Sequence, residues 1–502
     1  MDWKKLQNGS DIRGVALEGI SGEPINLTPK VVSVIAKAFV SWLQEEGSKD
    51  ITIAVGMDSR LSGSALKTAF AEGATCMGAN IVDCHIASTP AMFMATIDEN
   101  LKATAGVMLT ASHLPFNRNG LKFFTSNGGL DKKDITAILD IAANIQFIEA
   151  PVKGKITSYE FIDDYSSFLV NYIRKGAKNK SDYDQPLKGL KIIVDAGNGA
   201  GGFFADKVLA KLGANTNGSQ FLNPDGHFPN HIPNPEDEDA MHSICEAVKL
   251  NKADLGIIFD TDVDRSAVVD KNGNPINRNS LIALISAVIL KEHPGSTIVT
   301  DSITSDGLTK FIEHDLKGKH HRFKRGYKNV INESMRLNSL GEESWLAIET
   351  SGHAALRENY FLDDGAYLVA KLLVEMARLN AQGIELTQLI ETLEQPLESK
   401  EYRLHILEND FATYGNQILD KVLLEVEKIE GWEIVSPNFE GLRVRSNNPS
   451  EEGWFLLRMS LHDPVMPLNV ESQIEGGVSK IMKKIRQVIS PFAGLDISAL
   501  KD

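Results

Sequence analysis

The sequence predicts an α/β protein with three similar α/β domains, followed by a smaller C-terminal α+β domain. Two observations support this fold class. A unit of strand, polar or glycine-bearing loop and helix occurs three times, and the pattern changes to short strands with two helices after Pro396. At 502 residues the chain is long enough for about three or four domains. We expect these domains at residues 1–180, 181–280, 281–394 and 395–502.

The three repeated units share the same order of features. Each begins with a short apolar run that is typical of a buried strand, continues through a loop with glycine, aspartate or serine, and ends in a segment with helical periodicity. Repetition of one domain would produce this similarity. Any α/β chain could also produce it, because strands and helices alternate in all of them. The expected strands are 51–55, 191–194 and 297–300, and the helices after them end near residues 74, 212 and 312.

The other elements are assigned from composition and pattern. The segment 174–184 is polar and charged, which is typical of a linker between domains. Four strands and two helices account for the C-terminal domain. We expect its strands at 401–406, 432–435, 441–445 and 454–459, and its helices around 410–430 and 473–490.

Charge and cysteine content exclude several classes of protein. The net charge is -15, so the chain has no basic excess to neutralise nucleic-acid or membrane phosphates, and we expect neither partner. Cys76, Cys84 and Cys245 have no C-x-x-C spacing, which predicts reduced core residues rather than a zinc site or a disulfide framework. The N-terminus lacks the apolar core of a signal peptide, and no apolar run is long enough to span a bilayer, so we expect a cytoplasmic protein.

One loop gathers a serine, a histidine and a lysine. Ser112 and His113 follow the apolar run 106–109, and Lys122 follows ten residues after the serine. A serine placed there could act as a nucleophile or carry a phosphate, with His113 and Lys122 as polarising neighbours. The same Thr-Ala-Ser-His run is also typical of a helix N-cap, so the local sequence leaves both interpretations open.

A second motif places three carboxylates at the end of the apolar run 255–259. Asp260, Asp262 and Asp264 alternate, and their mutual repulsion favours a cation among them. All-oxygen ligands suit Mg²⁺ first and Mn²⁺ second. A calcium loop of the EF-hand type needs glycine and glutamate where this chain has Arg265 and Lys271, so that interpretation fails. A solvated acidic turn remains the alternative.

Taken in order, these and three further motifs resemble those of the α-D-phosphohexomutases, most closely the phosphomannomutase/phosphoglucomutase group, along almost the whole chain. Any one match is modest, whereas the ordered set is highly specific. The matching motifs are Asp11-Ile12-Arg13-Gly14, then Gly56, Asp58 and Arg60, then the Ser112 loop with Lys122, then Asp260 to Arg265, and finally Glu349-Thr350-Ser351-Gly352-His353.

The resemblance implies an intramolecular phosphotransferase that moves a phosphate between O1 and O6 of a hexose. Ser112 would carry the phosphate through a bound 1,6-bisphosphate, with glucose 1,6-bisphosphate as activator. One Mg²⁺ per subunit would be held by a phosphoserine oxygen, Asp260, Asp262 and Asp264, and would act as a Lewis acid. The implied substrates are mannose and glucose phosphates, and the implied protein is a monomer or homodimer with mixed sheets around a central cleft.

The resemblance also assigns roles to charged and polar residues around the phosphate. Arg265 and Lys122 would offset developing negative charge, and Arg13 would be a further active-site cation. Glu349 and Ser351 would hold sugar hydroxyls on two adjacent carbons. From the local sequence alone, these two residues could also simply mark the end of the apolar strand before them.

Three basic side chains complete the implied site. His353 could transfer protons near the sugar, because histidine titrates close to neutral pH, and a structural histidine is an equally good interpretation of this residue alone. The family's acid and base assignments are divided between the positions that match Lys122 and His353, so we leave the role shared. Lys328 lies in a loop that resembles a substrate-contacting loop, and we expect it to contact phosphate or sugar.

The resemblance is weakest in the fourth domain, which should hold the phosphate that is not reacting. In place of the family's R-P-S-G-T-E-P loop, this chain keeps Arg458 and Ser460, which can supply a guanidinium clamp and a hydroxyl. Leu461 and His462 replace the small and hydroxyl residues of that loop, which puts its phosphate affinity in doubt. Leu114 is a second departure, beside the serine, where the family usually has Asn.

Two other functions fit parts of the sequence. A phosphoglucosamine mutase is the enzymatic alternative, although the E-x-S-G-H motif fits that group less well. A non-catalytic paralogue that binds sugar phosphates is suggested by Leu461 and His462. The intact Ser112, the three aspartates and Lys122 argue against this second alternative.

Overall fold

The computed structural model describes residues 2–144, 146–179, 182–460 and 463–500. The chain divides into two compact units. The first combines Met1–Leu281 with Ser351–Leu389, and the second combines Ile282–Thr350 with Ile390–Asp502. None of the helices in the described part of the chain has the length and apolarity that a membrane span requires.

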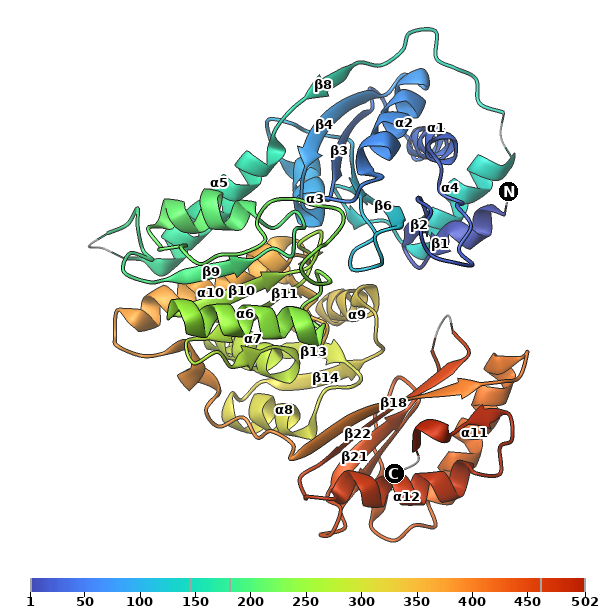
Figure 1. The fold of residues 1–502 in the computed structure, drawn as a ribbon, viewed down its shortest axis with the longest axis vertical. Helices are drawn as coiled ribbons and strands as arrows, with labels where there is room; N and C mark the ends of the chain where they lie inside the picture. Colours follow the sequence, from blue (N-terminus) through green and yellow to red (C-terminus); the bar gives the residue numbers. More distant parts are fainter. Residues whose placement is uncertain (1, 145, 180–181, 461–462, 501–502) are drawn as a thin grey trace. The chain divides into compact units, whose positions relative to one another are not determined.

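A mixed eight-stranded sheet forms the N-terminal part of the first unit (Figure 1). Its order is β1-β2-β6-β5-β3-β4-β8, and β7 pairs with β6. β3 runs parallel to β4 and β5, whereas β6 runs antiparallel to β2 and β5. The side chains of β5 are all buried, as expected for a central strand covered on both faces. The strands are β1 (Gln7–Asn8), β2 (Asp11–Val15), β3 (Thr52–Met57), β4 (Asn80–Ile86), β5 (Ala105–Leu109), β6 (Arg118–Thr125), β7 (Gly128–Gly129) and β8 (Ile156–Ser158).

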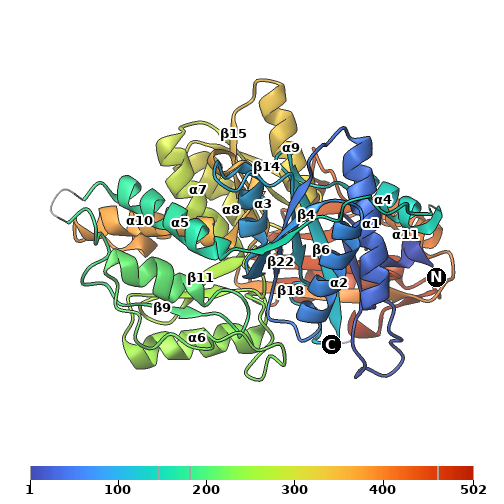
Figure 2. The same ribbon diagram turned by 90° about the horizontal axis from the view of Figure 1, so that it is seen from above.

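Two long helices, α1 (Pro29–Glu45) and α2 (Gly63–Cys76), lie side by side against this sheet (Figure 2). α1 begins where Thr28 accepts a hydrogen bond from the backbone N–H of Val31, and proline occupies its first position. Both features favour a helix start, because they satisfy or remove amide donors that have no partner there. The other helices of this part are α3 (Thr89–Ile97), α4 (Lys132–Asn144) and α5 (Phe161–Ala177).

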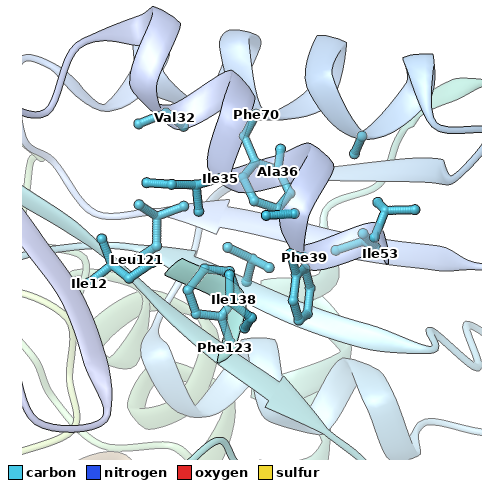
Figure 3. Close-up of a cluster of buried hydrophobic side chains, with 14 of the residues drawn as sticks. Ile12, Val32, Ile35, Ala36, Phe39, Ile53, Phe70, Leu121, Phe123 and Ile138 are labelled. Carbon is cyan, nitrogen blue, oxygen red and sulfur yellow. The ribbon is translucent and has the colours of Figure 1, made fainter. Parts of the chain in front are cut away.

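The core between these helices and the sheet is apolar and closely packed. Figure 3 shows Phe39 of α1, Phe70 of α2 and Phe123 of β6 among its members. The ring centroids of Phe39 and Phe123 are 4.7 Å apart. Burying such a side chain stabilises the fold by roughly 1.5–3 kcal/mol, so this core holds the sheet that carries the serine loop in place.

A four-stranded sheet of order β12-β11-β10-β9 follows in the first unit. β10 is parallel to β9 and antiparallel to β11, so the acidic motif lies in the turn between β10 and β11. The helix predicted to end near residue 212 is instead a π-helical segment, Phe204–Leu209, followed by a 3-10 turn. The elements are β9 (Ile192–Asp195), α6 (Glu238–Asn251), β10 (Leu255–Phe259), β11 (Ser266–Asp270) and β12 (Pro275–Ile276), and β16 (Ala354–Leu356), β17 (Leu362–Asp363) and α10 (Gly365–Asn380) complete the unit.

The second unit contains a parallel group of strands and the C-terminal sheet. β13 runs parallel to β14 on one side and β15 on the other. The C-terminal sheet has the order β19-β20-β21-β22-β18-β23, its neighbouring strands run antiparallel, and α11 and α12 pack on it (Figure 1). The elements are α7 (Arg278–Glu292), which starts in the first unit, β13 (Thr297–Asp301), α8 (Asp306–Lys310), the π-helical Phe311–Asp315, β14 (Lys319–Phe323), α9 (Tyr327–Ser339), β15 (Ser344–Ile348), β18 (Glu398–Ile406), α11 (Phe411–Val426), β19 (Trp432–Ile434), β20 (Leu442–Ser446), β21 (Gly453–Leu457), β22 (Val465–Ser472), α12 (Gly477–Ile489) and β23 (Leu495–Asp496). Short 3-10 turns are Trp3–Leu6, Ala210–Leu212, Arg357–Asn359, Leu386–Ile390 and Ser498–Leu500.

The α/β class and the C-terminal α+β domain are confirmed, with further local corrections. The predicted linker 174–184 begins too early, because Arg174 lies in the last turn of α5, and residues 180 and 181 lie outside the described residues. β22 and β23 are not among the four strands expected for this domain. In the structure Pro467 is an interior residue of β22 and pairs with Arg403 of β18.

Candidate active site

Ser112 lies in the loop between β5 and β6, and this loop leads into a strand and not into a helix. The helix N-cap interpretation of the Thr-Ala-Ser-His run is therefore wrong. Ser112 has a φ of +52°, a conformation that residues other than glycine rarely adopt, and its N–H donates to Oγ1 of Thr110 at 2.9 Å. The surrounding loop holds this strained turn, and strain of this kind is typical of functional sites.

The side chain of Arg60 holds the serine loop in shape through hydrogen bonds to its backbone. Its guanidinium is fully buried beside Asp58, with Nε 3.3 Å from Oδ2 of the carboxylate. The sequence analysis gave Arg60 no role, because its hydrogen-bond partners lie more than fifty residues away along the chain. Its guanidinium donates to the backbone carbonyls of Ser112, Leu114, Pro115 (2.7 Å) and Arg118 (3.0 Å).

The acidic turn after β10 brings three buried carboxylates together. One oxygen of each of Asp260, Asp262 and Asp264 lies within 4.8 Å of the others. Val263, between them, has a φ of +67°, which is an outlier for a β-branched residue. A turn this sharp places the alternate aspartates on one side of the chain. Their spacing in the sequence therefore brings one oxygen of each close to the others.

Lys122 and Arg265 balance part of this negative charge. Nζ of Lys122, from β6, lies 3.0 Å from Oδ2 of Asp262 and also forms a close ion pair with Asp264. The guanidinium of Arg265 donates to Oδ2 of Asp260 through Nε, at 3.1 Å, and through Nη2, at 3.0 Å. Two cations thus face three carboxyl groups in a buried site.

Ser112 is joined directly to this charged cluster. Its hydroxyl donates to Oδ2 of Asp260 at 3.1 Å and accepts from Nη2 of Arg265 at 2.9 Å. The same Nη2 lies 2.8 Å from Nδ1 of His113. Burial, reinforced by the charges of Arg265 and Arg13, lowers the pKa of His113 to about 3, so this imidazole is neutral at pH 7 and accepts the hydrogen bond.

The carboxylates of the cluster differ in how firmly their charge is held. Burial and the neighbouring Asp264 raise the pKa of Asp260 well above its ordinary value. For Asp264, burial acts in the same direction, but Lys122 and Arg265 outweigh it and lower the pKa to about 2. Oδ1 of Asp262 and Oδ1 of Asp264 are buried and accept no hydrogen bond from any described residue. These two oxygens fit a hard divalent cation.

Arg13 and the S-G-H turn border the same cluster in the first unit. Arg13 pairs in register with Gly120 across β2 and β6, and its Nη2 lies 2.9 Å from Oδ2 of Asp11. Nδ1 of His353 lies 2.8 Å from Oγ of Ser351, and Nε2 lies 3.9 Å from Oδ1 of Asp264. Burial, with the charges of Arg265 and Lys122, lowers the pKa of His353 well below its ordinary value, so it is a neutral imidazole at pH 7.

Glu349 and Lys328 lie in the second unit. Oε1 of Glu349, which follows β15, accepts the backbone N–H of Gly326 at 2.6 Å. Lys328 is in the first turn of α9, directly after this glycine. The hydrogen bond fixes the glutamate beside the N-terminus of α9, which places the carboxylate and the lysine on neighbouring segments.

Arg458 and Ser460 follow β21 in the same unit. Arg458 is buried, its Nη1 lies 3.9 Å from Oε1 of Glu440, and its Nε makes no hydrogen bond to a described residue. Ser460 donates its N–H to the carbonyl of Val465 at 2.9 Å. Leu461 and His462, the departures noted in this loop, lie outside the described residues.

Glu440 is a residue of this region that the sequence analysis missed. It accepts the N–H of Arg325 at 3.2 Å and the hydroxyl of Ser302, in addition to facing Arg458. No local pattern marks Glu440, because its partners come from three separate segments of the chain.

Comparison with known proteins gives consistent matches over nearly the whole chain. Three family models match, described as Phosphoglucomutase/phosphomannomutase, alpha/beta/alpha domain I at residues 4–149, domain II at 165–273 and domain III at 277–396. A phosphomannomutase/phosphoglucomutase of Pseudomonas putida is 30% identical, over 95% of this chain and 93% of its own length. A phosphoglucomutase of Neisseria meningitidis serogroup B is also 30% identical, over 94% of this chain and 95% of its own.

Solved structures agree with these matches. A crystal structure of a phosphoglucomutase/phosphomannomutase family protein from Burkholderia thailandensis has a TM-score of 0.78 and 27% sequence identity, and the match covers 97% of this chain and 98% of the other. The similarity therefore extends through the C-terminal domain as well as the first three.

Proposed function

Because the chain belongs to the phosphoglucomutase/phosphomannomutase family, we propose that it is a mutase that interconverts hexose 1-phosphate and hexose 6-phosphate, with mannose and glucose as the sugars. The observation that carries this proposal is the environment of Ser112 Oγ. It lies 3.1 Å from a carboxylate oxygen of Asp260 and 2.9 Å from a guanidinium nitrogen of Arg265. A phosphate on this oxygen would lie next to the aspartate oxygens that can bind a metal. It would also lie next to the guanidinium of Arg265, which is a fixed cation.

The reaction follows from these groups. The sugar hydroxyl attacks phosphorus, the bond from phosphorus to Ser112 Oγ breaks, and the hydroxyl's proton passes to a neighbouring base. The resulting 1,6-bisphosphate then returns its other phosphate to Ser112 by the reverse step. Arg265 stabilises negative charge on the transferring group. His353 and Lys122 are the candidate groups for this proton transfer, and the proposal leaves the role shared between them.

We propose Mg²⁺ as the metal, held by Asp260, Asp262, Asp264 and a phosphoserine oxygen. The buried Oδ1 atoms of Asp262 and Asp264 support this assignment. When bound, the ion acts as a Lewis acid on the phosphoryl oxygens. The proposal includes glucose 1,6-bisphosphate as activator, a monomeric or homodimeric protein and a cytoplasmic location.

Recognition of the sugar phosphate is assigned to further polar groups. Glu349 and Ser351 are proposed to hold hydroxyls on adjacent carbons, and Arg458 with Ser460 to hold the phosphate that is not reacting. Lys328 is a further candidate contact. The buried guanidinium of Arg458 supports its role, because a charge enclosed in this way gains most from a phosphate partner.

Phosphorylation of Ser112 is the decisive test. After incubation with glucose 1,6-bisphosphate and Mg²⁺, we expect intact-mass analysis to show one added phosphate and peptide mapping to place it on Ser112. Ser112→Ala should lose the modification and all turnover, whereas Ser126→Ala, at an exposed position between β6 and β7, should keep both. A protein that is never phosphorylated at Ser112 would be a non-catalytic sugar-phosphate binder.

The sugar is tested by a coupled assay with glucose 1-phosphate, mannose 1-phosphate and glucosamine 1-phosphate. We expect turnover of the first two, since they differ only in the configuration at C2. Turnover of glucosamine 1-phosphate alone would identify the phosphoglucosamine mutase alternative.

A further inference from the structure

His353, Asp264 and Asp363 form a second group of metal-binding atoms beside the aspartate cluster. One ligand atom of each lies within 4.8 Å of the other two. Nε2 of His353 is 3.9 Å from Oδ1 of Asp264 and 3.7 Å from Oδ2 of Asp363. Both aspartates are buried, and all three residues belong to the first unit.

Oδ1 of Asp264 is the ligand atom that this second group shares with the aspartate cluster. Asp264 is 2% exposed, and this oxygen accepts no hydrogen bond from any described residue although it is enclosed by protein. Leaving a buried carboxylate oxygen without a hydrogen bond is unfavourable, because the oxygen has lost its contact with water and gained no donor. A cation bound between Asp264 and His353 would remove that cost.

The three ligands are also held in place through their other polar atoms. Oγ of Ser351 lies 2.8 Å from Nδ1 of His353, the N–H of Ala354 donates to Oδ1 of Asp363 at 2.9 Å, and Lys122 pairs with Oδ2 of Asp264. Such contacts orient metal ligands, because they fix the imidazole and carboxylate planes before the ion arrives. The three side chains therefore have restricted orientations before an ion binds.

One nitrogen and two carboxylate oxygens suit a different ion from an all-oxygen set. Imidazole favours Zn²⁺ and other transition metals over Mg²⁺. Ligand atoms of a tetrahedral Zn²⁺ site lie about 3.4 Å apart, given bonds of about 2.0–2.1 Å. The two separations from Nε2 of His353, 3.7 and 3.9 Å, therefore need only a small contraction, and one oxygen of each aspartate lies within 4.8 Å of the other.

We propose that Asp264, His353 and Asp363 form a second divalent-cation site, which takes a transition metal such as Zn²⁺ and shares Asp264 with the Asp260–Asp264 cluster. Water would supply the fourth ligand. The consequence for activity rests on the proposed function: Zn²⁺ would occupy Nε2 of His353 and remove it from proton transfer, so Zn²⁺ would inhibit an enzyme already supplied with Mg²⁺.

Binding is tested without turnover, on the full chain. Co²⁺ serves as a spectroscopic probe and Zn²⁺ as its competitor, both in excess Mg²⁺. We expect one equivalent of Co²⁺ to give visible absorption bands of a nitrogen-ligated site, and one equivalent of Zn²⁺ to abolish them. His353→Gln and Asp363→Asn should lose the bands, and Ser351→Ala should weaken Co²⁺ binding by about 10–100-fold.

Asp262→Asn is the matched control, because Asp262 belongs to the all-oxygen group alone. It should keep the Co²⁺ bands. Loss of the bands in Asp262→Asn, or full retention in His353→Gln, would overturn the proposal. Anomalous diffraction at the zinc edge from wild-type crystals tests the same point without substitutions, and a zinc peak away from Nε2 of His353 would also overturn it. Failure of the mutase assay with intact Co²⁺ binding would refute only the proposed function.

Discussion

At the scale of single residues, Arg60 controls the position of the proposed phosphate carrier although it is not expected to touch substrate. Its guanidinium donates to four carbonyls of the serine loop and pairs with Asp58. Burial raises the pKa of Asp58 to about 6, against the opposing charge of Arg60. Asp58 therefore depends on Arg60 for its charge, and the loop depends on Arg60 for its shape.

Arg60→Met should destabilise the protein by about 3–5 kcal/mol, because it leaves a buried carboxylate without its partner and four carbonyls without a donor. Urea denaturation measures this change. Arg118→Met, which removes a partly exposed pair with Glu23, should cost less than about 1 kcal/mol. The double variant Asp58→Asn/Arg60→Met should regain part of the stability without regaining Ser112 phosphorylation. A single Arg60→Met variant as stable as the wild type would contradict this account.

The residues of the candidate site differ in how far the sequence could reveal them. Asp260, Asp262 and Asp264 lie within five consecutive residues, so their spacing shows that one turn gathers them. Arg60 acts on a loop 52 residues away, and nothing in its immediate sequence shows this contact. The sequence predicts local groups because chain geometry fixes them, whereas the fold decides which distant side chains meet them.

At the scale of elements, the turn between β15 and β16 depends on a glycine. Gly352 has a φ of +93°, and a Cβ at this position would lie 2.7 Å from the carbonyl oxygen of Ser266. The turn thus combines a left-handed conformation with close backbone packing against β11. It carries Ser351 and His353, so its position decides where both side chains lie.

Gly352→Ala should therefore lower stability and kcat together, since the turn must move away from Ser266. Gly383→Ala is the matched control, with a φ of +73° and nothing within 4 Å of the added Cβ. In the control, the strain of a left-handed alanine should lower the free energy of unfolding by about 1–2 kcal/mol, and kcat should be unchanged. Thermal unfolding and steady-state assays of the two variants separate strain from clash. Equal effects on kcat would show that the close packing has no role.

The C-terminal sheet contains a carboxyl group that should make stability depend on pH. Glu471 of β22 is 7% exposed, and Nε1 of Trp454 donates to its Oε2 at 2.9 Å. Burial raises the pKa of Glu471 to about 7, although Trp454 and Arg443 act in the opposite direction. The ordinary value is 4.5. In the folded chain the carboxyl group therefore keeps its proton over a pH range in which the unfolded chain loses it.

The sign of the effect follows from proton linkage. Between about pH 4.5 and 7 the unfolded state binds fewer protons at this residue, so stability falls as pH rises, by roughly 3 kcal/mol in total, and then levels off. Glu471→Gln should remove this fall and be more stable than the wild type at pH 8, with little difference at pH 4. Urea denaturation across this range measures it. Parallel stability curves for the two proteins would refute the prediction.

Element boundaries could be predicted where an apolar run ends at a clear turn, as for β10 and β13. They failed where a single residue carries a misleading signal. Pro467 lacks an N–H and reads as a break, yet the neighbours of β22 use its carbonyl, which accepts the N–H of Arg458 at 3.1 Å. The π-helical turn after β9 also has no sequence signature, because it differs from an α-helix only in its hydrogen-bond spacing.

At the scale of the whole molecule, the repeated order of strand, polar loop and helix was enough to predict the α/β architecture. It did not predict that residues 351–389 pack with the N-terminal half of the chain. This grouping rests on contacts such as the hydroxyl of Tyr165, which donates to Asp364 at 2.6 Å. Partners separated by 199 residues are decided by packing and leave no periodic trace in the sequence.

The residues with proposed roles fall in both units. The first unit holds Ser112, the aspartates, Lys122, Arg265 and His353, which we propose act on the phosphoryl group. The second unit holds Glu349, Lys328 and Arg458, which we propose recognise the rest of the substrate. Substitutions in the two units should therefore change different kinetic constants.

Lys122→Ala should lower kcat far more than it changes KM, because it removes a cation from the reacting group. Arg458→Ala should raise KM by about 10–100-fold, since a hydrogen bond between a guanidinium and phosphate is worth about 1.5–3 kcal/mol. Arg403→Ala, an exposed arginine of β18 paired with Glu401, is the control and should leave both constants unchanged. Steady-state assays with glucose 1-phosphate measure all three variants. An Arg458→Ala enzyme with the wild-type KM would show that the altered loop after β21 does not hold the substrate phosphate.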